Sequence, residues 1–126
     1  MRHIIIGVLI LLAVTGFTAA SAWYVSDAVA QTAAELEQAY QYAQSEQMDL
    51  AKDCVQQASN LWDRHGSYFG TVLRHDEIDG VVGEFAKLKV TVEAGDPDEF
   101  MPTCAGLLAT LRHIQEMEHL YFSNLF

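Results

Sequence analysis

Positively charged residues are scarce in this sequence of 126 residues, which has 7 Lys and Arg against 17 Asp and Glu. The formal net charge is −10 at pH 7, and the chain after Arg2 carries −11. A surface of that sign repels nucleic-acid phosphates and anionic lipid headgroups, which argues against both as general ligands. We therefore expect a protein partner or a cation, and no nucleic acid.

The sequence also lacks the motifs of common catalytic sites. It has no Cys-x-x-Cys pair, no glycine-rich phosphate loop and no twelve-residue calcium loop with ligands at regular offsets. No nucleophile is paired with a base in a recognisable motif. We therefore expect no enzymatic activity and no cofactor.

Charge is absent from one long stretch, Ile4–Val25, which reads IIIGVLILLAVTGFTAASAWYV. This stretch is long enough to cross the ~30 Å hydrocarbon core of a bilayer as a helix, and Trp23 and Tyr24 stand where interfacial aromatic residues belong. We interpret residues 1–25 as a transmembrane anchor and residues 26–126 as an acidic helical domain. Because Arg2 and the N-terminal amine are the only positive charges beside the start of the span, the positive-inside rule predicts a cytoplasmic N-terminus and an extracytoplasmic domain.

A secretory signal peptide is the alternative interpretation of this stretch. Both Ala20–Ala22 and Ala28–Ala30 have small residues at the two positions that a signal peptidase requires. Against cleavage, the basic region is a single arginine and the apolar run exceeds the usual signal core. Retention in the cell membrane as a single-pass protein is the preferred prediction, and secretion after cleavage is the alternative.

The rest of the chain has the apolar period of helices and contains only two prolines. Apolar residues recur at steps of three and four along four stretches, the first of which continues from the span without interruption. The others begin near Asp49, Asp76 and Asp96, which can cap helix N-termini. The predicted buried stripes are Val25, Val29, Thr32, Leu36, Ala39 and Ala43; Ala51, Cys54, Val55, Ala58, Leu61, Trp62, His65 and Phe69; Ile78, Val81, Val82, Phe85, Leu88 and Val92; and Phe100, Cys104, Leu107, Leu108, Leu111 and Ile114.

Four such helices joined by short turns predict an all-α fold, in which an N-terminal transmembrane helix continues into an antiparallel four-helix bundle. A shift of 49 residues aligns apolar positions of the two halves, such as Leu36 with Phe85 and Trp62 with Leu111. We interpret the bundle as two helical hairpins of one design. Two unrelated amphipathic hairpins that agree by chance explain the alignment equally well.

This topology returns the C-terminus to the membrane-facing end of the bundle. The chain ends in LYFSNLF, an apolar and aromatic sequence that is unusual for a solvated tail. We predict that Tyr121, Phe122 and Phe126 lie at the membrane interface together with Trp23 and Tyr24. The alternative is that the C-terminal residues cover the open end of the core.

The two cysteines, Cys54 and Cys104, fall at similar heights on the apolar stripes of the two descending helices. In an exported domain this placement allows a disulfide between them. The preferred alternative is that both are small buried core residues with free thiols.

One pair of residues has metal-ligand spacing. Glu116-x-x-His119 matches half of a ferritin-like di-metal site, but the second pair and the inward-facing glutamates are missing, so we expect no metal there. Glu118, in contrast, returns to the apolar face of its helix. A buried carboxylate needs a partner, so we predict either a polar site of Glu118 with His65 or His75, or a solvated Glu118 beyond the core.

Acidic residues gather at the end of the predicted bundle that is far from the membrane. A divalent cation could bind there, but a solvated acidic face is the preferred interpretation because the ligand spacing of a calcium loop is missing. The seven residues of this acidic tip are Glu46, Asp49, Asp53, Glu93, Asp96, Asp98 and Glu99.

The short N-terminal span, the segments Leu61–His65 and His75–Asp79, and Leu111–Ile114 followed by Glu116 and Glu118 resemble the bacterial domain-of-unknown-function family 4363. The resemblance extends over nearly the whole chain, although its motifs are short. It implies a small single-span envelope protein with no established activity and no catalytic residues to transfer. It also favours retention of the anchor and a membrane or envelope protein as partner.

We therefore expect a membrane-tethered helical interaction or accessory protein of the bacterial cell envelope, anchored in the lipid bilayer. A homodimer is a further hypothesis, because Gly16 and Ala20 have the Gly-x-x-x-Ala spacing that lets two membrane helices approach closely. The alternative function is an extracytoplasmic sensor domain that binds a cation or a small ligand.

Overall fold

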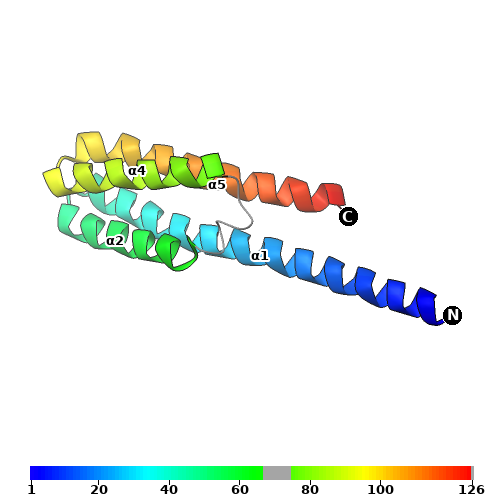
Figure 1. Cartoon of the computed structure of the whole chain (residues 1–126). Coiled ribbons are helices and arrows are strands. Elements are labelled where there is room, and N and C mark those ends of the chain that lie inside the picture. Colours follow the sequence, from blue (N-terminus) through cyan, green and yellow to red (C-terminus); the bar gives the residue numbers. More distant parts are fainter. Residues whose placement is uncertain (67–74, 126) are drawn as a thin grey trace.

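The computed structural model describes residues 1–66 and 75–125, and over these ranges it consists of four α-helices (Figure 1). They are α1 (Arg2–Gln44), α2 (Met48–Arg64), α4 (His75–Ala94) and α5 (Pro97–Leu125). The predicted all-α fold is confirmed. Phe69 and Phe126 lie outside the described residues, as do the side chains of His75, Tyr121 and Phe122.

The helices form an antiparallel bundle in which each helix packs mainly against two neighbours. α1 contacts α2 and α5, and α4 also contacts α2 and α5. α1 therefore lies diagonally across the bundle from α4, and α2 lies diagonally across from α5. Chain direction alternates around this ring, as the colours of Figure 1 show. Short turns and one apolar stripe per helix lead to this arrangement, because each stripe can be buried only against its neighbours.

The predicted stripes of α1 and α5 form much of the core. All six stripe residues of each helix are buried, from Val25 to Ala43 on α1 and from Phe100 to Ile114 on α5. Thr32 is polar and fully buried, but its Oγ1 donates to the carbonyl oxygen of Ala28 at 3.0 Å, which satisfies the hydroxyl inside the core.

The stripe on α4 is narrower than predicted. Val81, Phe85, Leu88 and Val92 are buried, whereas Val82 is 53% exposed. Val82 follows Val81 directly, and one residue turns the side chain by about 100° away from the core. The prediction that Val82 belongs to the core was therefore wrong.

The N-terminal part of α1 extends beyond the bundle (Figure 1). Its large aliphatic and aromatic side chains from Ile4 to Phe17 are 50–74% exposed. The helix is long and apolar enough to cross a membrane, and no part of its most apolar window is buried against the bundle. A retained anchor and a signal sequence share this length and composition. The exposed and buried parts belong to one uninterrupted helix, Arg2–Gln44.

Each of the two short turns contains one residue in the left-handed backbone region. Glu46 in the α1–α2 turn has φ +61°, and Gly95 in the α4–α5 turn has φ +70°. These positions are 49 residues apart, which is the same shift that aligns the apolar stripes. The two hairpins thus turn at equivalent positions, and this agreement supports their interpretation as two units of one design.

α5 begins after its predicted N-cap residue, whereas α2 begins without the predicted cap. Asp96 precedes α5, and its Oδ1 accepts a hydrogen bond from the amide of Asp98 at 3.0 Å. α2, however, begins at Met48 after Gln47, without a side-chain cap. Asp49 lies inside the first turn, where its carboxylate still interacts favourably with the positive end of the helix dipole.

Candidate functional site at the junction of α1 and α5

The apolar span of α1 meets the bundle at a junction with α5. Gln115 on α5 donates from Nε2 to the carbonyl oxygen of Ser26 on α1, at 3.2 Å. Ser26 follows Val25, which is 1% exposed and is the first buried residue of the α1 stripe. The bond therefore marks the level at which α1 enters the core. α5 continues past this level toward the N-terminal end of α1 (Figure 1).

An open groove of about 550 Å³ lies at this junction, lined by Ser26, Gln115, Glu116, His119 and Leu120. Glu116 and His119, the pair with metal-ligand spacing, are both exposed on its wall. Within the described parts of the chain, no group of three or more His, Cys, Asp or Glu side chains could hold a metal ion. The groove thus offers two dispersed ligands, fewer than the three or four protein ligands of a typical zinc site.

On the neighbouring side of the junction, α1 contacts the end of α2. The hydroxyl of Tyr24 lies 2.5 Å from Nδ1 of His65, and the two rings meet edge to face with centroids 5.1 Å apart. Tyr24 is 39% exposed, whereas Trp23 is 70% exposed. Of the two aromatic residues predicted at the membrane interface, Trp23 therefore projects from the protein and Tyr24 also ties α1 to α2.

Glu118 lies on the inner face of α5, as its helical position predicts, and is half-buried. Burial, and then the negative charge of Glu77 on α4, raise the pKa of the Glu118 carboxyl above its ordinary value. The predicted site combined Glu118 with His65 or His75. In the structure His65 contacts Tyr24, and the neighbour that perturbs Glu118 is an acid.

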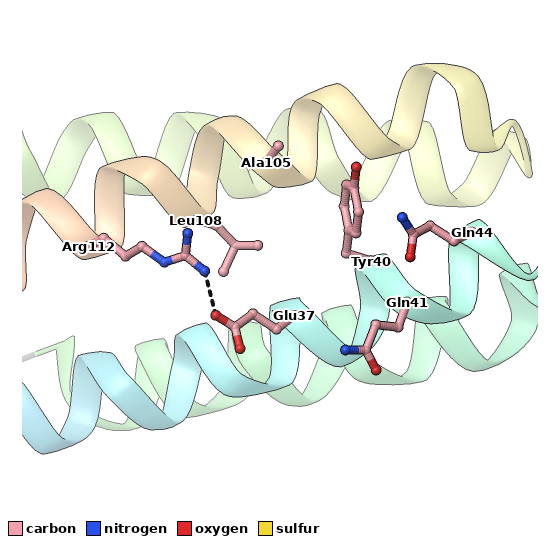
Figure 2. Close-up of a pocket in the computed structure, with 7 residues that line it drawn as sticks. All are labelled: Glu37, Tyr40, Gln41, Gln44, Ala105, Leu108 and Arg112. Carbon is pink, nitrogen blue, oxygen red and sulfur yellow. Dashed lines mark hydrogen bonds and ion pairs between the residues drawn. The ribbon is translucent and has the colours of Figure 1, made fainter.

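A second groove, of about 340 Å³, lies between α1 and α5 nearer the middle of the bundle (Figure 2). Arg112 crosses it, and Nη2 of this residue lies 2.6 Å from Oε1 of Glu37. Both side chains are at least half exposed, so the ion pair contributes at most about 1 kcal/mol. Figure 2 shows Tyr40 projecting toward α5 on the other side of Leu108 from this pair, with the Gln44 side chain beside it. The groove offers hydrogen-bonding groups and an aromatic ring.

The two cysteines are free, buried thiols, so the alternative of a disulfide is not realised. Cys54 is on α2 and Cys104 is on α5, which lie diagonally across the bundle. Sγ of Cys104 donates to the carbonyl oxygen of Leu36 on α1, at 3.4 Å. Burial raises the pKa of the Cys104 thiol to about 12 and also raises the pKa of Cys54. Both thiols therefore remain protonated and weakly nucleophilic at neutral pH.

The acidic tip forms at the far end of the bundle, at the turns after α1 and α4. Lys52 on α2 pairs with Glu93 on α4, with Nζ 2.7 Å from Oε1, and this contact raises the pKa of Lys52. The carboxylate of Asp96 accepts the α5 cap bond described above. Two of the seven acidic residues, Glu93 and Asp96, thus have an ion pair or a hydrogen bond that belongs to the fold.

Sequence reasoning did not single out Gln115, Tyr40 or Glu37. All three lie at the edges of buried stripes on the neighbouring helices α1 and α5. Polar residues that flank a buried stripe meet across a helix interface. Their positions in the sequence could therefore have predicted that they form contacts between helices. The sequence did not show which helix faces which, and the contact partners depend on that.

A family model described as a domain of unknown function, DUF4363, matches residues 19–125. The chain belongs to the DUF4363 family. No curated protein and no solved structure matches the chain. The DUF4363 match begins inside the apolar part of α1 and includes the whole bundle, with both grooves. Because the function of this family is unknown, the match assigns no activity or catalytic residue to the junction.

Proposed function

We propose that this DUF4363 protein is a membrane-anchored, non-catalytic accessory protein of the bacterial cell envelope. The N-terminus lies in the cytoplasm, α1 crosses the cell membrane, and the bundle stands outside it as a binding surface for another envelope protein. The observation that carries the proposal is that the exposed apolar segment and the first core helix form one continuous α1.

Continuity of α1 supports a retained anchor. A chain cleaved after Ala30 would lose Val25, Ala28 and Val29, which are at most 2% exposed in the core. It would also lose the contacts of Tyr24 with His65 and of Ser26 with Gln115. Cleavage after Ala22 would leave these contacts in place, so this site is the one that an experiment must exclude.

Charge supports the orientation and the class of partner. Arg2 is the only Lys or Arg before the span, which favours a cytoplasmic N-terminus under the positive-inside rule. The strongly acidic bundle disfavours nucleic acids and anionic lipid surfaces as ligands. An envelope protein with a basic or mixed surface is compatible with both grooves between α1 and α5.

Anchoring is tested with the intact chain expressed in a bacterium. Mass spectrometry of the mature protein should give residues 1–126, and alkaline carbonate should leave the protein in the membrane pellet. Protease added to spheroplasts should digest the bundle. A mature chain that begins at Trp23, or a bundle that is protected from protease, would refute the anchor or its orientation.

The accessory role is tested by purification from membranes in a mild detergent after brief crosslinking. We expect one stoichiometric protein partner. The control is a variant in which residues 4–22 are replaced by an unrelated apolar span, and the partner should be retained if it binds the bundle. Recovery of the chain with a bound ion or metabolite in place of a protein would favour the sensor function instead.

A further inference from the structure

We propose that the end of α5, residues 117–125, is a second membrane contact that rests in the headgroup region beside α1. This inference rests on the proposed function, because it needs α1 to cross the bilayer. In this proposal the end of α5 binds a lipid surface.

α5 is longer than the bundle requires. Under the 49-residue shift, α2 (Met48–Arg64) corresponds to residues 97–113 of α5. α5 continues for twelve further residues, from Ile114 to Leu125, which have no counterpart in α2. Of the four described helices, α1 and α5 alone continue in this direction beyond the ends of α2 and α4 (Figure 1). Ile114 is still buried in the core, so the last part of this added length is what lies beside the apolar span.

The register of α5 on α1 shows how far this extension reaches. Gln115 lies level with Ser26 because its side chain donates to the Ser26 carbonyl. From Gln115 to Leu125 an α-helix rises about 15 Å, whereas Trp23 lies only about 4.5 Å beyond Ser26 on α1. Because the two helices run antiparallel, α5 ends about 10 Å past the level of Trp23. That is within the apolar part of α1.

The described side chains of the extension suit an apolar surface. Met117 is 45% exposed and Leu120 is 55% exposed, although both are large and apolar. The chain continues with Tyr121, Phe122 and Leu125 before α5 ends. The polar positions Glu116, His119 and Ser123 recur at steps of three and four, so they share one side of the helix. Glu118 lies on the other side of the helix, toward the bundle, so the described apolar side chains available to a lipid surface are Met117 and Leu120.

Two physical limits set how deep the end of α5 lies in the bilayer and which class of lipid it contacts. The last four carbonyl groups of a helix have no partner within the helix, so the tip must stay among headgroups or water. The hydrocarbon core must therefore begin below the level of Leu125, about 10 Å past Trp23. The acidic bundle repels anionic headgroups, so apolar burial must drive the contact. We therefore expect contact with a zwitterionic bilayer, without dependence on anionic lipid.

The test uses the full-length chain in phosphatidylcholine vesicles at a high lipid-to-protein ratio. An environment-sensitive fluorophore is attached to cysteine in the variants Leu120→Cys and Val90→Cys. Val90 is 70% exposed on α4 and is the matched control away from the junction. The wild-type chain controls for labelling of Cys54 and Cys104, which are buried.

We expect a quencher on the upper acyl chain to reduce fluorescence at position 120 at least threefold more than at position 90. Aqueous iodide should show the opposite preference. Equal access of iodide to both positions would overturn the proposal. Protection from iodide without lipid quenching would also overturn it, because a second copy or the bundle itself would then cover the residue.

Two further variants separate this inference from the proposed function. Ile10→Cys reports on the span and should be quenched by a probe at the bilayer centre. If it is not quenched, the anchor itself is refuted, whereas a failure at position 120 alone refutes only the α5 contact. Met117→Cys is a second reporter on the extension, used if the Leu120 variant has lost its helical circular dichroism signal.

Discussion

At the scale of single residues, the two hairpin turns have a left-handed residue at equivalent positions but differ in its side chain. Gly95 adopts its positive φ without a Cβ, whereas Glu46 adopts nearly the same angle with one. A left-handed backbone costs most L-residues about 1–2 kcal/mol. The α1–α2 turn therefore holds local strain that the α4–α5 turn avoids.

We predict that Glu46→Gly increases the free energy of unfolding by about 0.5–1 kcal/mol. Relief of the left-handed strain is partly offset by the greater freedom of glycine in the unfolded chain. Gly95→Ala should decrease the free energy of unfolding by about 1 kcal/mol. A Cβ at Gly95 would meet no atom within 4 Å, so that loss would come from the backbone alone. Urea unfolding followed by circular dichroism measures both, and a stabilised Gly95 variant would contradict the argument.

A second prediction concerns pH. The raised pKa of Glu118 means that the folded protein binds this proton more tightly than the unfolded chain does. The carboxylate therefore lowers stability at neutral pH, and this loss disappears as the pH falls through the folded pKa, which lies above 4.5. Glu118→Gln should be more stable than wild type at pH 7, and the difference should shrink toward pH 4.5.

Glu116→Gln is the matched control for this titration, since Glu116 lies two residues away and is exposed. The difference in the free energy of unfolding between Glu116→Gln and wild type should vary less with pH than the same difference for Glu118→Gln. Unfolding free energies at pH 7, 6, 5 and 4.5 suffice. A Glu118→Gln difference that stays constant over this range would show that Glu118 is solvated.

Helical positions predicted most buried residues but not their partners. Leu36, Phe100 and Leu111 were placed correctly from spacing alone, because a stripe at steps of three and four defines one face. The Glu118 carboxyl was also placed on the inner face, yet its neighbour Glu77 was not foreseen. Spacing within one helix contains no information about which residue of another helix lies opposite.

At the scale of elements, the continuity of α1 is the feature with the most consequences. The sequence predicted it, because the stripe from Val25 to Ala43 keeps the helical period of the preceding span. The order of helices around the bundle was not predicted in detail. This is why Cys54 and Cys104, which share a height and a chain direction, were candidates for a disulfide although their helices are diagonal.

Truncation tests how much of α1 the bundle needs. We predict that residues 23–126 fold cooperatively, whereas residues 31–126 lose about 3–6 kcal/mol through removal of the buried Val25 and Val29. Thermal unfolding of the two fragments, followed by circular dichroism, makes the comparison. Equal stability would show that the first buried turns of α1 are dispensable and that the junction does not hold the bundle together.

At the scale of the whole molecule, the exposed span offers a surface for a second copy. We predict that Gly16→Ile reduces crosslinked dimer in detergent at least threefold, because a large side chain prevents close approach of two helices. A Cβ at Gly16 would meet no atom within 4 Å in the chain itself, so the fold should be unaffected. Gly7→Ile in the same helix is the control. Unchanged crosslinking in the Gly16 variant would exclude a dimer through this face.

The architecture was more predictable than the candidate site, for a physical reason. Helix number, direction and the two-hairpin design follow from apolar period and turn length, which are local properties. The junction depends on side chains such as Gln115, Tyr24 and Arg112 that meet across long sequence separations. Those contacts depend on how each helix is rotated and shifted along its neighbours. The apolar pattern within one helix does not determine this rotation or shift.

The unbroken α1 also sets the distance between the membrane and the acidic tip, and so how strongly salt screens one from the other. From Trp23 to Gln44 the helix rises about 31 Å, with no flexible segment between. In an anchored chain whose α1 stands along the bilayer normal, the acidic tip is thus about four Debye lengths above the level of Trp23 at physiological ionic strength. Membrane composition then cannot alter the potential at the tip. Only the solution and a bound partner can, so charge-dependent association there should be the same in neutral and anionic bilayers.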